Sequence, residues 1–269
     1  MSTVPTEPTD PAPPRVLAIT NQKGGVGKTT TAINLAAALA DFGHPTLLID
    51  LDPQAHATIG LGIDPAALPH TMSHVLTADT PLADVLQPTS APNLQIAPAH
   101  MDLAFAEESL SKAVGRDVRL KKRLEELGPR FEYVVIDSPA QLNLLTINTM
   151  AAATEVVVPL HSQYYSFVGL AQLLETIRMM QSWVNPALVI AGALVTQFDK
   201  RSALHRRALE RLRTELDGQL RVFHTVIPHG LRAQYAAEYH SPVVRLFPRS
   251  PVGRAYKELA AEVAHVQPA

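Results

Sequence analysis

The chain contains no cysteine, and only 5% of its 269 residues are aromatic. Without thiols it forms no disulfide and holds no thiolate-ligated metal or iron–sulfur cluster. The formal net charge is only −2, so the composition is not that of a globally basic nucleic-acid binder, and any DNA contact must come from a local patch. No run approaches the roughly 20 apolar residues of a membrane helix, and the first residues lack the basic-then-apolar order of a secretion signal. These absences predict a cytoplasmic protein with no membrane partner.

Hydrophobic residues make up 46% of the chain, which is enough for a substantial core. Single α/β domains of this length are common. Residues 1–14 carry five prolines and few apolar side chains, so they cannot bury enough surface to order themselves. We therefore expect a disordered Pro-rich tail over residues 1–14, either a solvated leader or a docking segment, and one domain over residues 15–266.

Apolar runs typical of buried strands alternate with helical patterns along this domain. The expected strands are 16–20, 46–49, 94–97, 133–136, 156–160, 188–195, 222–227 and 243–247. The expected helices include 30–41, 118–127, 167–183 and 203–216. Continuous apolar strands separated by helices are typical of a mostly parallel sheet covered on both faces. The predicted fold class is α/β, with a twisted, mostly parallel sheet and helices on both faces.

Residues 21–30 read Asn-Gln-Lys-Gly-Gly-Val-Gly-Lys-Thr-Thr and lie between an expected strand and an expected helix. Glycines let the backbone N–H groups turn toward an anion, and the helix that follows adds the positive end of its dipole. In such a loop Lys28 reaches the β- and γ-phosphates and the Thr29 hydroxyl ligates Mg²⁺. Gln22 stands where the usual phosphate-loop pattern has glycine, and a second lysine, Lys23, precedes the glycine pair.

This run resembles the deviant Walker A box of the ParA/MinD ATPase family, in particular the small Soj-like partitioning ATPases. The resemblance extends over about residues 15–263. It implies a P-loop NTPase fold and a Mg²⁺-dependent ATP hydrolase in which Lys23 reaches across a homodimer to the partner's nucleotide. The implied catalytic residues are Lys23, Lys28 and Asp52. The implied ATP-binding residues are Lys23, Gly24, Gly25, Val26, Gly27, Lys28, Thr29, Thr30 and Pro228.

Acidic residues end two of the expected strands. Asp137 follows Tyr-Val-Val-Ile, the Walker B pattern, where a carboxylate can hold Mg²⁺ through water; the alternative is a turn cap. Asp50 and Asp52 lie in Asp-Leu-Asp-Pro-Gln, which matches the family's switch element or caps the next turn. The resemblance implies that Asp52 orients the attacking water. The expected metal residues are Thr29, Asp50 and Asp137.

Basic residues in the second half of the chain are candidates for contact with DNA. Arg201 lies in Thr-Gln-Phe-Asp-Lys-Arg, similar to a family segment, and further arginines follow on a helix where they cannot all share one face. Arg232 keeps one of two basic positions that the family has near Pro228, whereas His229 replaces the other. The expected DNA-binding residues are Arg201, Arg206, Arg207 and Arg232, with ordinary solvated surface as the alternative for part of the cluster.

The resemblance implies an ATP-dependent dimer that binds DNA without sequence preference, on the nucleoid. A ParB-like or cargo adaptor protein would stimulate hydrolysis and so segregate a plasmid or chromosome, or position a protein cargo. Tyr164 and Tyr165 resemble a region beside the dimer face, or belong to an ordinary core helix. Two other functions stay open: a MinD-like regulator at the membrane, disfavoured by the last residues of this sequence, and a nucleotide-dependent enzyme on the same loop.

Overall fold

The computed structural model describes residues 12–161 and 167–265. Most of the expected N-terminal tail, Tyr164 and Tyr165 lie outside these residues. Within them, eight strands form one sheet in the order β3-β4-β2-β5-β1-β6-β7-β8. The strands are β1 (Arg15–Ile19), β2 (Thr46–Asp50), β3 (Gln87–Pro88), β4 (Leu94–Ala97), β5 (Tyr133–Asp137), β6 (Glu155–His161), β7 (Val189–Phe198) and β8 (Val222–Pro228).

All neighbouring strands run parallel except the short β3, which pairs antiparallel with β4. Alternate residues of the central strands face opposite cores: in β1, Val16 and Ala18 belong to one core, while Leu17 and Ile19 belong to the other. Both sets are buried, which explains why the strands read as continuous apolar runs. The expected α/β fold with a mostly parallel sheet is confirmed.

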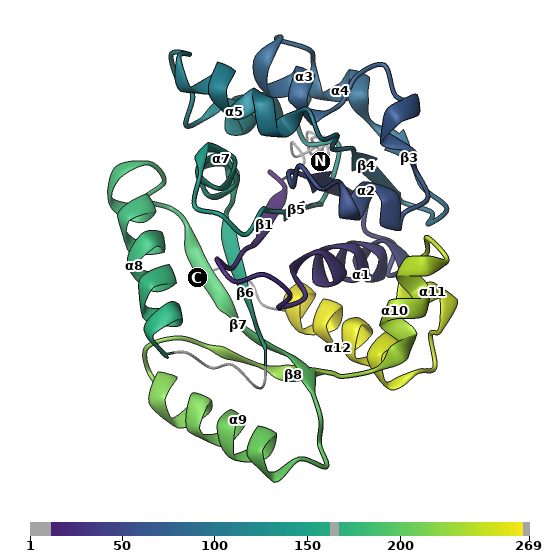
Figure 1. The fold of residues 1–269 in the computed structure, drawn as a ribbon, viewed down its shortest axis with the longest axis vertical. Coiled ribbons are helices and arrows are strands. Elements are labelled where there is room, and N and C mark those ends of the chain that lie inside the picture. The colour runs from purple at the N-terminus through teal and green to yellow at the C-terminus, as the bar shows by residue number, and fades with distance from the viewer. Residues whose placement is uncertain (1–11, 162–166, 266–269) are drawn as a thin grey trace, which may run out of the picture.

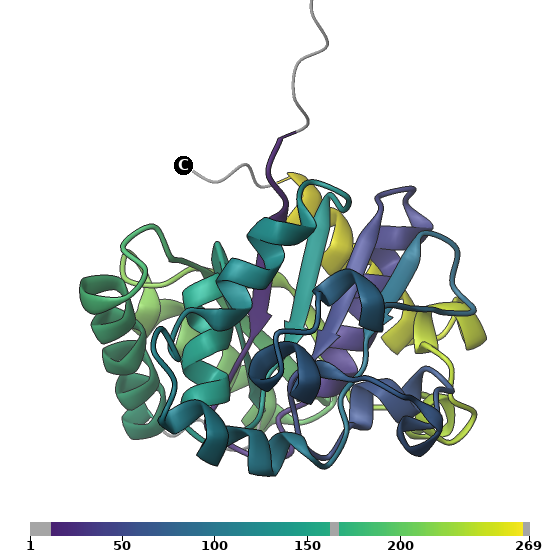
Figure 2. The same ribbon diagram turned by 90° about the horizontal axis from the view of Figure 1, so that it is seen from above.

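Helices cover both faces of the sheet (Figures 1 and 2). One face packs against α1 (Lys28–Asp41), α10 (Leu231–Glu238), α11 (Val243–Leu246) and α12 (Pro251–His265). The other packs against α3 (Met72–Thr77), α4 (Leu82–Val85), α5 (Leu103–Ser111), α6 (Arg119–Leu127), α7 (Leu144–Ala152), α8 (Phe167–Trp183) and α9 (Ala203–Leu216). The short α2 (His56–Gly60) and the 3₁₀ turn η1 (Pro65–Ala67) follow β2. Among the described residues, we find no helix with the length and apolarity needed to span a bilayer.

The expected strand over residues 243–247 is wrong, because the segment forms the helix α11. Pro242 precedes the helix, where its fixed φ and missing N–H do no harm. Val243 and Val244 are buried, and the Val244 N–H donates to the Asn34 side chain on α1 at 3.2 Å. A short apolar run has the same composition in a buried strand and in a buried helix, so the sequence pattern could not separate the two.

The register of the central strands places the predicted site at one edge of the sheet. Asp50 of β2 pairs with Asp137 of β5, which also pairs with Ile19 of β1. The last residues of β1, β5 and β2 therefore lie side by side, so the loop after β1 begins next to both aspartates. This edge is formed by the carboxyl ends of the parallel strands, where α/β folds bind ligands.

Candidate functional site

The loop between β1 and α1 has the backbone conformation of an anion cradle. Gly25 and Gly27 adopt φ values of 72° and 86°, in the left-handed region where a side chain would be strained. Gly27 is the N-cap of α1, and Lys28, Thr29 and Thr30 form the first helical turn. The unpaired N–H groups and the dipole of a 14-residue helix are thereby directed at the loop.

Two side chains of the neighbouring strand β7 and one side chain of the loop itself hold this loop in place. Thr196 and Gln197 of β7 donate to the carbonyl oxygens of Val26 and Gly25, at 2.8 and 2.7 Å. Asn21 donates to the Pro159 carbonyl at 2.7 Å. Sequence reasoning missed Gln197, whose left-handed φ of 52° is unusual for a residue with a Cβ. No sequence signal marks it, because its partner lies 172 positions away.

The two lysines of the loop occupy different environments. Lys28 is buried, and its Nζ donates to the Lys23 carbonyl at 3.3 Å. Burial lowers the pKa of Lys28, against the opposing attraction of the carboxylates of Asp137 and Asp52. Lys23, in contrast, is an exposed residue. The two lysines of the loop therefore differ in burial.

Asp137 is fully buried, and neither of its carboxylate oxygens has a hydrogen-bond partner among the described residues. Burial, and then the negative charge of Asp50, raise the pKa of Asp137 well above its ordinary value, although the nearby Thr29 hydroxyl and the Lys28 ammonium act in the opposite direction. A buried carboxylate without a partner is costly unless a cation compensates it. The oxygens of Asp137, next to the hydroxyl-bearing first turn of α1, fit the hard oxygen ligands that Mg²⁺ prefers.

Asp50 is also fully buried, but its oxygens are already engaged. Oδ2 accepts from the backbone N–H and the hydroxyl of Thr58, both at 2.8 Å, and Oδ1 accepts from the Asp52 N–H at 3.1 Å. Burial raises the pKa of Asp50 to about 6 against these hydrogen bonds. Asp50 therefore holds the segment after β2 in place. Asp52 is half-buried, and its Oδ1 accepts from the Gln54 N–H at 3.0 Å.

A hollow of about 280 Å³ lies beside the loop. Gly27 and Thr30 form one wall, Pro228 at the end of β8 contributes to another, and Ala233 of α10 and Tyr256 of α12 complete it. The tertiary structure thus brings Pro228 next to the loop, although 200 residues separate it from Lys28 in the sequence. The hollow is suited to a flat apolar ring attached to a phosphate group bound in the loop.

The predicted DNA-contacting arginines are all exposed. Arg201 follows β7, and Arg232 is the second residue of α10, after β8. A hydrogen bond from the His229 N–H to the Phe198 carbonyl, at 3.0 Å, joins the ends of these two strands. Arg206 lies on the second turn of α9, where it donates to the Lys200 carbonyl. Arg207 is its neighbour and projects in a different direction on the helix. Arg201 and Arg206 therefore lie after the carboxyl end of β7, and Arg232, whose guanidinium lies 4.5 Å from the centre of the Phe247 ring, lies after that of β8.

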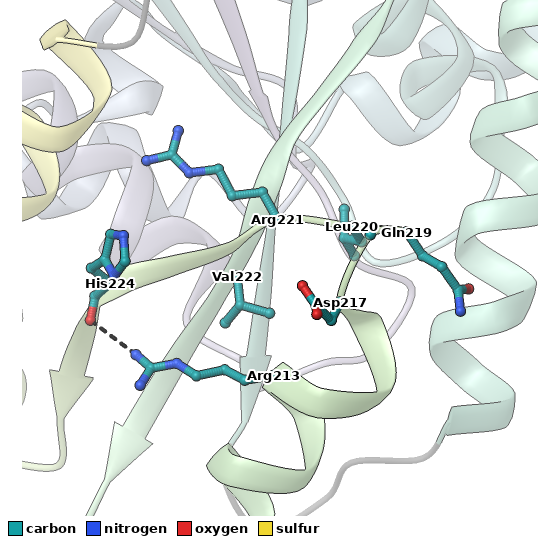
Figure 3. A pocket seen from close by; sticks show the side chains of 8 residues that line it. Arg213, Asp217, Gln219, Leu220, Arg221, Val222 and His224 are labelled. Carbon is teal, nitrogen blue, oxygen red and sulfur yellow. Dashed lines mark hydrogen bonds between the residues drawn. The ribbon is translucent and has the colours of Figure 1, made fainter.

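Arg213 of the same helix is placed differently. Its guanidinium donates to the His224 carbonyl on β8 at 3.4 Å, as Figure 3 shows. It lines a hollow of about 490 Å³ together with Asp217, Arg221 and His224. Arg221 immediately precedes β8, so this hollow is near the amino end of the strand, away from the phosphate loop.

Comparison with known proteins agrees with this geometry. A family model described as an AAA domain matches residues 14–190. The chain is 42% identical to the sporulation initiation inhibitor protein Soj of Bacillus subtilis, over 93% of this chain and 98% of Soj. A solved structure of cobyrinic acid a,c-diamide synthase from Mycobacterium smegmatis, with bound ADP and magnesium, superposes with a TM-score of 0.83 at 37% identity and covers 93% and 94% of the two chains.

A structure of Cyanothece McdA(D38A) in complex with ATP superposes with a TM-score of 0.84 at 25% identity, and covers 96% of this chain and 99% of McdA. The family match, the Soj relationship and the two-lysine phosphate loop at the carboxyl ends of β1, β2 and β5 all agree. The chain therefore belongs to the AAA-domain family, as a ParA/MinD-type P-loop ATPase related to Soj and the ParA partitioning proteins.

Proposed function

We propose that this protein is an ATP-dependent, dimerising ATPase that binds DNA without sequence preference and positions a DNA or protein cargo through partner-stimulated hydrolysis. One observation carries the proposal: a loop with one buried and one exposed lysine lies beside a buried aspartate whose oxygens have no partner among the described residues. The buried lysine, Lys28, and the aspartate, Asp137, suit a Mg²⁺–nucleotide held within the chain. The exposed lysine, Lys23, suits a nucleotide held by another copy of the chain.

Each residue has a distinct role in this proposal. The N–H groups from Gly24 to Thr30 and the Lys28 ammonium hold the phosphates, and Pro228 lies against the adenine. Thr29 and Asp137 would hold Mg²⁺, with Asp50 supporting them, and the ion would supply neutralisation of charge on the phosphoryl oxygens. Asp52 orients the attacking water. Lys23 of each copy approaches the phosphates of the other, so hydrolysis depends on the dimer.

Dimerisation also explains how few arginines suffice for DNA binding. Arg201, Arg206 and Arg232 lie near the carboxyl ends of β7 and β8, and two copies double their number on one surface. Nonspecific binding needs only several cations close to phosphates, and each contact adds about one to the slope of log affinity against log salt. We place Arg207 at the margin of this surface, because it projects away from Arg206.

The decisive experiment measures the affinity for nonspecific duplex DNA with ATP, ADP or no nucleotide, over a salt series, together with solution mass. We expect dimers and salt-sensitive DNA binding with ATP only. Arg201→Ala and Arg232→Ala should each lower the salt slope by about one to two in the dimer. Arg130→Ala, an exposed arginine before β5 at the amino end of the sheet, is the matched control. Binding that is independent of nucleotide contradicts the proposal.

A second candidate is favoured by the 37% identity to the cobyrinic acid a,c-diamide synthase structure. In that case the bound ATP would activate a carboxyl group of a small-molecule substrate such as cobyrinic acid, and DNA would play no part. Incubating the protein with ATP, an amide-nitrogen donor and cobyrinic acid tests this function. Formation of an amide product at the expense of ATP would establish the synthase, whereas ATP turnover that responds only to DNA and a protein partner would exclude it.

A further inference from the structure

A second hollow, of about 350 Å³, lies at the carboxyl ends of β6, β7 and β8. Three imidazoles line it: His161 ends β6, His205 lies on α9, and His229 follows β8. Gln197, Asp199 and Ser202 complete the lining. We call this hollow the histidine pocket. None of its histidines has a part in the nucleotide site described above.

Gln197 connects the histidine pocket to the phosphate loop. It lines both this pocket and the hollow beside Pro228. Its Nε2 donates to the Gly25 carbonyl at 2.7 Å, and its side chain also shares a hydrogen bond with His161. A single amide therefore joins an imidazole of the pocket to the backbone that cradles the phosphates. A ligand that moves His161 would therefore also shift Gln197 and, through it, the backbone of the phosphate loop at Gly25.

The charged and titratable groups facing His161 come from several elements. They are Lys23 of the phosphate loop, His205 of α9 and His229 after β8. Burial first, and then these three neighbours, lower the pKa of His161, although the hydrogen bond with Gln197 acts in the opposite direction. These surroundings therefore favour the neutral form of His161 in the free protein. Residues 162–166, which follow it, lie outside the described part of the chain.

The other members of the pocket have more constrained roles. The Nδ1 of His205 accepts a hydrogen bond from the Asp199 N–H at 2.9 Å, so this ring can donate a hydrogen bond only through Nε2. The Asp199 carboxylate accepts from the backbone N–H of Arg201, which lowers its pKa, and it also pairs with the Arg201 guanidinium. His229 is exposed. The rings that can gain a charge without losing this arrangement are His161 and His229.

The composition of the pocket favours an anion. In the part of the chain that the structure describes, no group of His, Asp and Glu has the geometry of a metal site, so the three imidazoles are not arranged as ligands. Lys23 adds a positive charge beside them, Arg201 is on the loop after β7, and Arg232 is in the first turn of α10, after β8. Imidazolium and neutral imidazole N–H groups both donate hydrogen bonds to phosphate oxygens.

We infer that the histidine pocket binds a phosphodiester group of DNA and takes up a proton as it does so, which makes DNA affinity rise as the pH falls. The inference rests on the proposed function, because it identifies where the ATP-bound dimer holds a phosphate. A bound phosphodiester stabilises the charged form of His161, which burial and the positive neighbours disfavour in the free protein, and it offers the exposed His229 ring a negatively charged partner. By linkage, affinity changes by up to about tenfold per pH unit for each proton taken up.

The test measures the affinity of the ATP-bound protein for nonspecific duplex DNA between about pH 8 and about pH 6, at constant ionic strength. We expect roughly tenfold tighter binding at the lower pH. His161→Gln and His229→Gln should each flatten this dependence, while His229→Arg should tighten binding most at about pH 8. The matched control is His224→Gln, an exposed histidine in the distant hollow of Figure 3, which should keep the full dependence.

Each outcome decides the question. ATP-dependent DNA binding with an equal pH dependence in the wild type and both glutamine variants overturns the inference and leaves the proposed function standing. Absence of ATP-dependent DNA binding at every pH overturns both. Titration with inorganic phosphate, followed by the NMR signals of the histidine rings, identifies the source of the anion. If a low concentration of phosphate shifts these signals and also abolishes the pH dependence of DNA binding, the pocket binds free phosphate instead. That result would also overturn the inference.

Discussion

At the scale of single residues, the two lysines of the phosphate loop differ in burial and therefore in the effect of their removal. Lys23→Ala should leave ATP affinity within about threefold of wild type, because Lys28 and the loop N–H groups remain. Partner-stimulated hydrolysis should fall by about 10²-fold, the usual effect of losing one donor to the transition state. Stimulated turnover and nucleotide affinity are measured side by side. Lys122→Ala, an exposed lysine on α6, is the control, and normal stimulated turnover in Lys23→Ala would contradict the proposed role.

Asp137 permits a second residue-scale prediction, because its buried carboxylate has no partner among the described residues. Asp137→Asn keeps the shape of the side chain and removes the cost of a buried charge. Without Mg²⁺ we expect the free energy of unfolding to rise by about 1–3 kcal/mol. The additional stabilisation of the wild type by ATP with Mg²⁺ should be lost in the variant. Thermal unfolding with EDTA, and with ATP and Mg²⁺, measures both effects; a variant that keeps the full Mg²⁺ gain removes Asp137 from the metal site.

At the scale of elements, Glu262 connects α12 to the edge strand β8. Its carboxylate accepts from the N–H groups of His224 and Thr225, at 2.9 and 3.0 Å, and from Arg221 at 2.8 Å. Burial alone would raise its pKa, but these hydrogen bonds hold it below the ordinary value. They also occupy backbone donors that an uncovered edge strand would offer to another chain.

Glu262→Gln should therefore lower the free energy of unfolding at pH 7 by about 1–2 kcal/mol, since the amide replaces a charged acceptor on a partly exposed site. A carboxyl group with a lowered pKa stabilises the fold above its unfolded-state pKa, and this contribution is lost as the pH falls through the folded-state value. The difference between variant and wild type should thus disappear in acid. Urea unfolding at several pH values measures it. The control is Glu258→Gln, on an exposed position of α12; an equal loss in both variants would contradict the role of Glu262.

At the scale of the whole molecule, the proposed cycle alternates between monomer and ATP-bound dimer. Asp52→Ala removes the group that orients the attacking water, so the ATP-bound form should persist. We expect a solution mass near twice the 29.1 kDa of one chain with ATP, for many times longer than in wild type, and prolonged DNA binding. Light scattering over time measures the mass. A variant that stays monomeric with ATP, while Gln54→Ala behaves as wild type, would show that Asp52 has another role.

The sequence alone predicted the alternation of strands and helices, the phosphate loop and the acidic residues that end β2 and β5. These features are local: glycine spacing, apolar periodicity and a strand-terminal carboxylate depend on residues close in the chain. The one expected strand that proved wrong, at residues 243–247, is a short apolar run. Such a run becomes a strand only where it can pair with an edge of the sheet. Residues 243–247 pack against α1 instead and form a helix.

Tertiary structure decided the features that depend on distant partners. Gln197 reaches the loop from 172 positions away, and Pro228 meets Gly27 only because β8 ends beside α1. Arg213 and Arg206 lie on one helix, yet the first is fixed against β8 while the second lies near the carboxyl end of the sheet. The three histidines share a pocket because parallel strands bring their carboxyl ends to one edge. Local composition determined what each segment could form, whereas the order of strands in the sheet determined which side chains meet.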